Sequence, residues 1–321
     1  MMLRRCTILL VLLLCACQPV LPVNIASAKN PAATDTSQPS WTPSSTATAL
    51  LTLTPTDTPL PARTPEPSAT FTVTPLPASL GLDPADWQDW PVVPIVPQRA
   101  RQIYQIGQAL GNDPHAFSVL GDCQSEPDFF MGIYETDPDV IAALPPELRQ
   151  TVDWFSGSFN RQSPTVKGGT TTGALLWPLW HQDKFTCTIY ESPLQCELRI
   201  HKPSFVIIHV GTHYESHNQD YMRAILDQVI AAGMVPILAS KADDRELDNH
   251  VNAEYAGLAV EYDIPFWNFW AAVDDLPNRG LYTRPDAPLQ GDLYLTDQAA
   301  AIHRMTALLA LDAVRRAVMG Q

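Results

Sequence analysis

Basic side chains are scarce in this sequence of 321 residues. Lysine and arginine together number 20 against 34 aspartates and glutamates, so the formal net charge is −14 at pH 7. So acidic a surface repels phosphate, which argues against nucleic acid or anionic lipid headgroups as partners. Neutral glycans, acyl esters and cationic ligands remain compatible with this charge.

The N-terminus has no apolar run long enough for a permanent membrane-spanning helix. Its apolar run, Ile8 to Leu14, follows Arg4 and Arg5 as in a secretory signal. The next residues, Leu14-Cys15-Ala16-Cys17, resemble a bacterial lipobox. We therefore expect a lipoprotein signal peptide over 1–16, lipidation of Cys17, and a mature chain of charge −16 anchored to the outer face of the cell membrane. An ordinary signal peptide is the alternative.

Cysteine is also sparse in the folded part. Of six cysteines, only Cys123, Cys187 and Cys196 would remain after cleavage and lipidation of Cys17. Cys187 and Cys196 bracket a short polar loop, and an exported location is oxidising, so we expect a disulfide between them. Cys123 would then be unpaired, although the sequence leaves other pairings open.

Charge is nearly absent between Gln18 and Leu80, where roughly half of the residues are Pro, Thr or Ser. Such a segment buries too little apolar surface to offset its ordering entropy. We expect residues 17–83 to form a disordered, extended linker and residues 84–321 to form one domain.

Within that domain, apolar runs alternate with segments of helical periodicity. The expected strands are 117–121, 205–210, 234–239 and 264–270. The expected helices are 98–110, 137–156 with a break at Pro145-Pro146, 218–232, 247–262 and 297–318. This alternation predicts βαβ units and an α/β fold, a three-layer α/β/α sandwich around a parallel sheet.

The first expected strand ends at Gly121-Asp122, and Cys123 follows on the turn. In open α/β sheets, ligands bind in the crevice beyond the carboxyl ends of the strands. Cys123 is therefore placed like a nucleophile. The alternative is a small buried hydrophobic residue, as most free cysteines are.

Other chemically active residues fall near the same sheet edge. Lys241 follows the strand 234–239 and is expected to contact substrate. Gly168-Gly169 precedes a helix-like segment, and this pair suits either a turn that offers N–H groups to a ligand or a plain surface turn.

Histidines are predicted to serve different roles. His209 and His303 are expected to be structural. His213 and His217 have the spacing of metal ligands on a helix but lack a third ligand in register, so we expect no metal and no cofactor.

The short motifs that follow the expected strands occur, over roughly residues 95 to 318, in an order that resembles the SGNH or GDSL-type esterases and lipases. The resemblance is strongest to exported SGNH-like proteins, through Phe-Asn-Arg-Gln-Ser, Cys…Glu-Ser-Pro-Leu-Gln-Cys-Glu and Gly-Thr-His elements that follow one another in this chain. It implies the flavodoxin-like SGNH hydrolase fold.

The resemblance also implies a set of site residues. Cys123 stands where the family has its nucleophilic serine. Gly169, with Gly168 close behind, matches the glycine that donates its N–H to the oxyanion. His213 replaces an asparagine that is a second oxyanion donor, and Tyr294 occupies the position of the general-base histidine.

A thiol tolerates these replacements better than a hydroxyl would, because a few per cent of it is ionised at neutral pH. A relocated pair of Cys123 and His213, with His213 as the base, is one mechanism that the sequence allows. Asp122, Ser125 and Tyr294 are also predicted to contact the substrate, and Ser125, two residues after Cys123, is a second candidate nucleophile.

The sequence thus predicts a surface-anchored, monomeric ester hydrolase acting on acyl or acetyl esters of small molecules or glycans. Its only membrane contact would be the lipid anchor. The alternatives are a catalytically inactive SGNH-fold module that binds glycans or envelope components, and a cysteine-dependent acyltransferase.

Overall fold

The computed structural model describes residues 81–180, 184–214, 217–283, 285 and 293–321. The chain divides into two units, Met1–Thr70 and Phe71–Gln321, and every described residue lies in the second. The predicted signal peptide, Cys17 and nearly all of the predicted linker lie outside the described residues. In the part that is described, no helix has the length and apolar character needed to cross a bilayer.

The described part is built on a parallel sheet with the strand order β1-β2-β3-β4. The strands are β1 (Asp113–Gly121), β2 (Pro203–His209), β3 (Val235–Ala239) and β4 (Phe266–Trp267). In register, Val119 lies opposite Ile207, and Ile207 lies opposite Ile237. Both faces of β2 and β3 are buried, as expected for a parallel sheet covered on both sides. The predicted fold class is confirmed.

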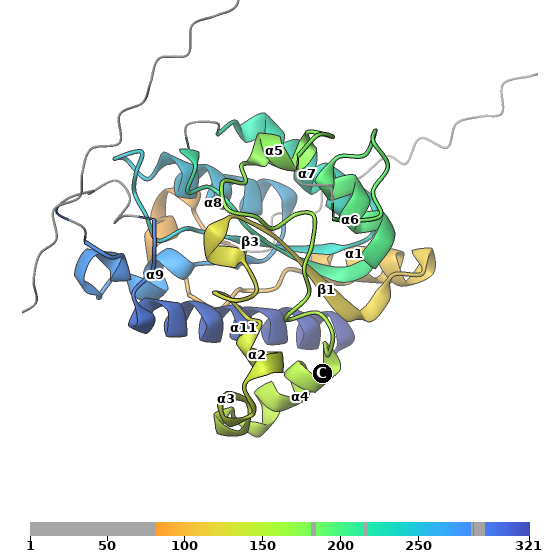
Figure 1. The fold of residues 1–321 in the computed structure, drawn as a ribbon, viewed down its shortest axis with the longest axis horizontal. Helices are drawn as coiled ribbons and strands as arrows, with labels where there is room; N and C mark the ends of the chain where they lie inside the picture. The colour runs from red at the N-terminus through yellow and green to blue at the C-terminus, as the bar shows by residue number, and fades with distance from the viewer. Residues whose placement is uncertain (1–80, 181–183, 215–216, 284, 286–292) are drawn as a thin grey trace, which may run out of the picture. The chain divides into compact units, whose positions relative to one another are not determined.

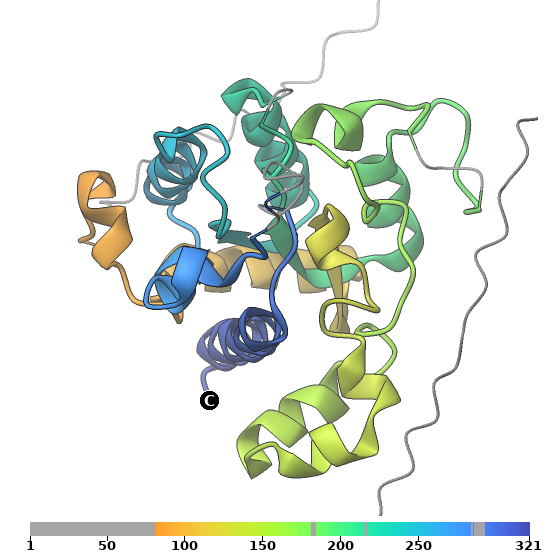
Figure 2. The same ribbon diagram turned by 60° about the vertical axis from the view of Figure 1, so that its left-hand side comes forward.

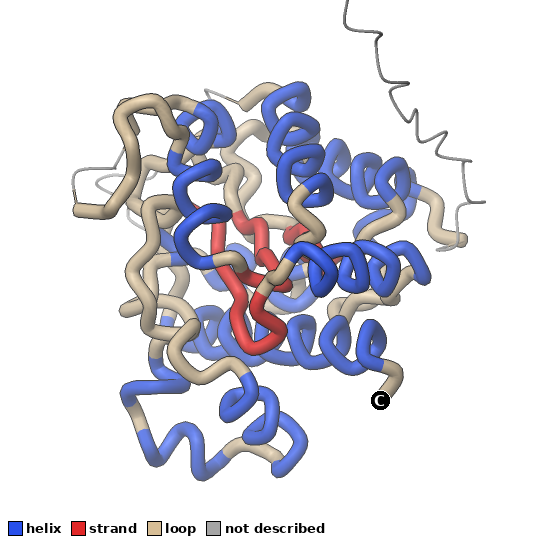
Figure 3. Tube along the Cα trace, turned by 90° about the vertical axis from the view of Figure 1, so that its right-hand side faces the viewer, coloured by secondary structure: helices blue, strands red, loops and turns tan. Residues whose placement is uncertain are grey.

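Helices cover both faces of the sheet (Figures 1 and 2). Each strand lies beside the preceding one, so right-handed crossovers place the connecting helices on one face. These are α6 (Pro193–His201), α7 (Gln219–Ala231) and α8 (His250–Tyr262). The opposite face is covered by α1 (Gln98–Leu110) and α11 (Asp297–Met319), which contact each other. Figure 3 shows the strands enclosed by helices.

Shorter elements connect this framework. They are η1 (Pro84–Asp89), η2 (Cys123–Ser125), α2 (Ile133–Thr136), α3 (Pro138–Ala143), α4 (Pro146–Trp154), α5 (Thr172–Leu176), α9 (Phe269–Val273) and η4 (Pro277–Gly280). The predicted break at Pro145-Pro146 is confirmed, because α3 ends before it and α4 begins at the second proline.

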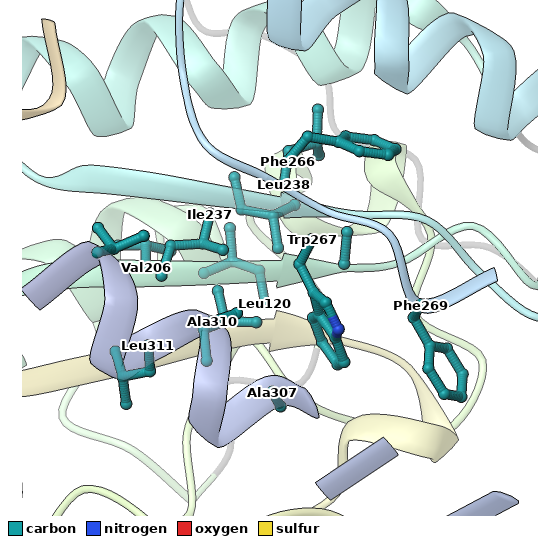
Figure 4. Close-up of a cluster of buried hydrophobic side chains, with 14 of the residues drawn as sticks. Leu120, Val206, Ile237, Leu238, Phe266, Trp267, Phe269, Ala307, Ala310 and Leu311 are labelled. Atoms are coloured by element: carbon teal, nitrogen blue, oxygen red, sulfur yellow. The ribbon is translucent and has the colours of Figure 1, made fainter. Parts of the chain in front are cut away.

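The core between the sheet and α11 is shown in Figure 4. Leu120, Ile237 and Trp267 of the strands are buried against Ala307 and Ala310 of the helix. Alanine side chains let the helix lie close to the sheet, and each large apolar side chain buried there stabilises the fold by about 1.5–3 kcal/mol.

The last strand is much shorter than the predicted 264–270. After Phe266–Trp267 the chain turns at Asn268, whose Oδ1 accepts the N–H of Ala271 and caps α9. The Nδ2 of Asn268 donates to the carbonyl of Trp87, 2.8 Å away. A contact with η1, far away in the sequence, therefore ends this strand.

Candidate functional site

The candidate site lies at the carboxyl ends of β1, β2 and β3, where the segments after these strands converge. Asp122, directly after β1, accepts the backbone N–H of Gln124 at 3.1 Å and so caps the short helix η2. This cap places Cys123 at the start of η2, on the turn predicted from the sequence.

Cys123 is partly exposed and is a free thiol. It lines a hollow of about 460 Å³, together with Tyr294. The predicted disulfide between Cys187 and Cys196 is confirmed, with their Cα atoms 5.3 Å apart. The structure thus brings two of the predicted site residues, Cys123 and Tyr294, to one opening.

The surroundings of Cys123 oppose ionisation of its thiol. Burial, together with the carboxylates of Asp122 and Glu126, raises the pKa of Cys123 to about 12. None of the hydrogen bonds found among the described residues joins Cys123 to an imidazole. The thiol is therefore neutral at neutral pH.

Of the two neighbouring glycines, Gly168 is the one that lies against Cys123. A Cβ atom added to Gly168 would lie 3.7 Å from the Cβ of Cys123, whereas Gly169 borders a second hollow beside Trp180. The N–H of Gly168 donates to Oε1 of Glu126, at 2.7 Å. The backbone donor beside the thiol is thus already bonded to a carboxylate.

His213 lies close enough to Asp122 to influence the pKa of its carboxyl group. The pKa of Asp122 is raised to about 6, chiefly by burial and also by Asp243, while the backbone N–H of Gln124 and the nearby His213 oppose the rise. Nε2 of His213 is buried and has no hydrogen-bond partner in the described part of the chain. The hydroxyl of Thr212 donates to Asp243 at 3.0 Å. Asp122, Thr212 and Asp243 follow β1, β2 and β3, so these polar side chains connect the ends of three strands.

Lys241 is enclosed rather than presented to a ligand. Its side chain is 2% exposed, and its ammonium group donates to the carbonyl and Oδ1 of Asp243 and to Oε2 of Glu246, at 2.8, 2.9 and 2.6 Å. These three bonds use all three N–H donors of the ammonium group. Lys241 neutralises two buried carboxylates and has no donor left for a substrate.

Ser125 is also closed off. Its Oγ lies 3.1 Å from Nδ1 of His209 and 3.2 Å from the carbonyl oxygen of His209, and both residues are buried. A Cβ atom at Gly121 would come within 2.2 Å of the Ser125 hydroxyl, so glycine is needed there. Burial, together with the charge of Lys241, lowers the pKa of His209 to about 4. This serine and histidine form a packed contact within the domain, away from the hollow.

His303, expected to be structural, lies in the core. Its ring centroid is 4.7 Å from that of His209 and 4.4 Å from that of Phe269. Burial, together with the charge of Arg304 and the presence of His209, lowers the pKa of His303 well below its usual value. In the residues that the structure describes, no three His, Cys, Asp or Glu side chains are placed to share a metal ion.

Sequence reasoning did not single out three residues of this site. Glu126 follows Cys123 by three positions, and this proximity was the one signal available. Tyr282 and Arg304 reach the hollow from a short antiparallel bridge and from α11. No sequence motif marks either of them.

No family model and no curated protein matches the chain. The solved structures that it resembles include a GDSL-like lipase from Bacteroides thetaiotaomicron VPI-5482, with 19% identity, a TM-score of 0.41, and coverage of 68% of this chain and 98% of that one. They also include a putative acylhydrolase from Bacteroides fragilis NCTC 9343, with 15% identity, a TM-score of 0.42, and coverage of 67% and 94%.

Proposed function

We propose that this chain is an exported SGNH-fold domain, anchored to the outer face of a bacterial membrane through Cys17, that binds a glycan or another envelope component without hydrolysing it. The observation that carries the proposal is the bond from the N–H of Gly168 to the carboxylate of Glu126, next to Cys123.

An ester hydrolase of this type needs an activated nucleophile, a base within hydrogen-bond reach and donors aimed at the developing oxyanion. The nucleophile fails the first requirement. With the pKa of the Cys123 thiol raised to about 12, only about one molecule in 10⁵ carries a thiolate at pH 7. The thiol is held in its unreactive form.

The backbone donor next to the thiol, the N–H of Gly168, is occupied. An oxyanion that approached the N–H of Gly168 would meet the carboxylate of Glu126, which already accepts that hydrogen. Like charges at hydrogen-bond distance repel strongly in a partly buried site. Glu126 would therefore destabilise the transition state that such a donor ordinarily stabilises.

The base is absent from the place where the family resemblance expects it. Tyr294 lines the hollow there, and a phenol at neutral pH donates a proton rather than accepting one. Nδ1 of His209 lies 3.1 Å from Oγ of Ser125, and Nε2 of His213 has no hydrogen-bond partner in the described part of the chain. These placements favour binding over turnover.

A second candidate function is thiol-dependent ester hydrolysis. The observation that favours it is the position of Cys123 at the wall of an open hollow, where a small ester can reach the sulfur. It would require Glu126 to move or to be protonated when substrate binds.

One experiment separates these two functions. The purified full chain is incubated with p-nitrophenyl acetate, alongside a Cys123→Ser variant and chain treated with iodoacetamide. We expect the release of p-nitrophenol to be equal in all three samples and no faster than with bovine serum albumin. Turnover that is lost in Cys123→Ser and after alkylation would overturn the proposal and establish the thiol enzyme.

A further inference from the structure

The hollow beside Cys123 has a stacking surface of three partly exposed aromatic side chains. Phe129 is 62% exposed, Tyr282 46% and Tyr294 51%. Its volume of about 460 Å³ falls within the range of roughly 300–1,000 Å³ that is common for small-molecule sites. Large aromatic side chains are usually buried, so three of them around one opening indicate a surface that something covers.

The two tyrosines are held side by side by the backbone. Leu281 and Leu295 form an antiparallel bridge, and the N–H of Tyr282 donates to the carbonyl of Tyr294 at 2.9 Å. Residues directly opposite each other across such a bridge project their side chains to the same side. Both rings therefore face the hollow as a preformed pair, with apolar faces and polar hydroxyl tips.

Polar groups of both kinds surround these rings. Arg304 of α11 lines the hollow and has no ion pair or hydrogen bond with any described residue, so its guanidinium can donate to a ligand. Asp128 and Asp297 line the hollow and supply acceptors. Gln124 is only 5% exposed, and its Oε1 is buried without a partner, although its Nε2 donates to the carbonyl of Leu293.

This mixture selects one kind of ligand. An apolar ligand would leave the Gln124 oxygen and the guanidinium of Arg304 without partners, which costs binding free energy. An anion would face two carboxylates and a chain of net charge −14. A cation would face the unpaired Arg304. A neutral polyol with an apolar ring face satisfies every group, because each hydroxyl both donates and accepts.

The geometry points to a neutral hexopyranose unit as the ligand of this hollow, with its ring stacked on Tyr282 and Tyr294 and its hydroxyls bound by Arg304, Asp128 and Gln124. This inference rests on the proposed binding function and names its ligand class. The residue next to the bound sugar would be Cys123, which explains why a neutral thiol suffices at that position.

The test is isothermal titration calorimetry of the full chain with four probes: cellobiose, N,N′-diacetylchitobiose, an unsaturated hyaluronan disaccharide as the anionic probe, and choline as the cationic probe. We expect at least one neutral disaccharide to bind with a Kd of about 1 mM or lower. Tyr294→Ala and Arg304→Gln should each weaken its binding at least about tenfold, whereas Tyr294→Phe should retain it within about threefold.

Tyr221→Ala is the matched control. Tyr221 is a comparably exposed tyrosine of the second hollow, with 42% exposure, and its loss should leave binding unchanged. Unfolding midpoints of all variants should stay close to that of the parent, because every substituted side chain is at least partly exposed.

Three results would overturn the inference. The first is tighter binding of choline or of the anionic disaccharide than of either neutral disaccharide, and the second is binding of a neutral disaccharide that responds to Tyr221→Ala but not to Tyr294→Ala. The third is no saccharide binding at concentrations of about 20 mM. Ester turnover by a chain that still binds disaccharide through Tyr294 would overturn the proposed function alone. A chain that neither turns over ester nor binds a probe would overturn this inference alone.

Discussion

The carboxylate of Glu126 accepts the backbone N–H of Gly168 at 2.7 Å, on the side of Gly168 that faces Cys123. One side chain thereby occupies a backbone donor and adds negative charge beside a thiol. The same side chain thus takes up the N–H of Gly168 and accounts for part of the raised pKa of Cys123.

Replacing Glu126 by glutamine should make Cys123 more reactive. The amide can still accept from Gly168, but the negative charge that raises the pKa of the thiol is gone. Because burial and Asp122 contribute more to that pKa, we expect a partial effect, at least about threefold in the rate of reaction with iodoacetamide at mildly alkaline pH. Asp128→Asn is the control, since Asp128 lines the hollow but does not act on the thiol. Equal alkylation rates for the parent and Glu126→Gln would contradict this account.

Removing the buried cation Lys241 should destabilise the fold. In Lys241→Met, the buried carboxylates of Asp243 and Glu246 lose their counter-charge, and we expect a loss of about 3–5 kcal/mol in the free energy of unfolding. Urea titration measures this loss. Arg223→Gln breaks the exposed ion pair with Glu261 and should cost less than about 1 kcal/mol.

The double variant Lys241→Met/Glu246→Gln refines this test. It removes one of the two uncompensated charges, so it should be more stable than Lys241→Met alone. If the double variant were no more stable, the ion pair would not be the source of the loss.

Stability should fall on acidification because of the buried histidines. Burial lowers the pKa of His209 to about 4, and that of His303 lies well below its usual value. Between pH 6.5 and 4 the unfolded chain binds protons that the folded chain does not, so the free energy of unfolding decreases as pH falls. His209 alone should contribute a decrease on the order of 3 kcal/mol over this window.

Substitution of His303 by phenylalanine should make the free energy of unfolding depend less steeply on pH in this acidic range. The ring lies among Phe130 and Phe269, with centroids 4.5 and 4.4 Å away, so a phenylalanine suits the surroundings. Urea unfolding at several pH values between about 7 and 4 gives the slope. The exposed His250→Gln should keep the parent slope. An unchanged slope in His303→Phe would show that this ring does not titrate on unfolding.

Loss of the Glu197 carboxylate should loosen the segment that follows Phe159. Arg161 binds both oxygens of Glu197, at 2.5 and 2.9 Å, and Ser118 of β1 donates to the same carboxylate, which is fully buried. We expect Glu197→Ala to cost about 3–5 kcal/mol and Ser118→Ala about 1–2 kcal/mol in urea titrations. If Glu197→Ala cost less unfolding free energy than Ser118→Ala, the buried carboxylate of Glu197 would not be what holds Arg161 and Ser118 together.

Local pattern was sufficient for much of the architecture. The alternation of apolar runs and helical periodicity predicted the parallel sheet, because strands buried on both faces must be apolar throughout. Gly111, with a φ of 83°, ends α1 as the sequence indicated, and the spacing of Cys187 and Cys196 predicted their disulfide. These features depend on neighbours within a few residues of one another.

The roles of the site residues depended on contacts that no local pattern contains. Ser125 and His209 are 84 positions apart, and Glu126 and Gly168 are 42 apart. The position of Lys241 after β3 predicted that it lies at the edge of the sheet where ligands bind. Whether carboxylates enclose its ammonium group depends on how the loop after β3 folds back.

The sequence by itself thus determined the layered α/β framework and the placement of Cys123 beyond the first strand, since hydrophobic periodicity and turn residues act locally. Only the tertiary structure decided that the carboxylate of Glu126 accepts the N–H of Gly168 beside the thiol and that Tyr282 pairs with Tyr294 over an open hollow. The physical reason is that charge, burial and free hydrogen-bonding capacity are set by the segments that the fold brings together.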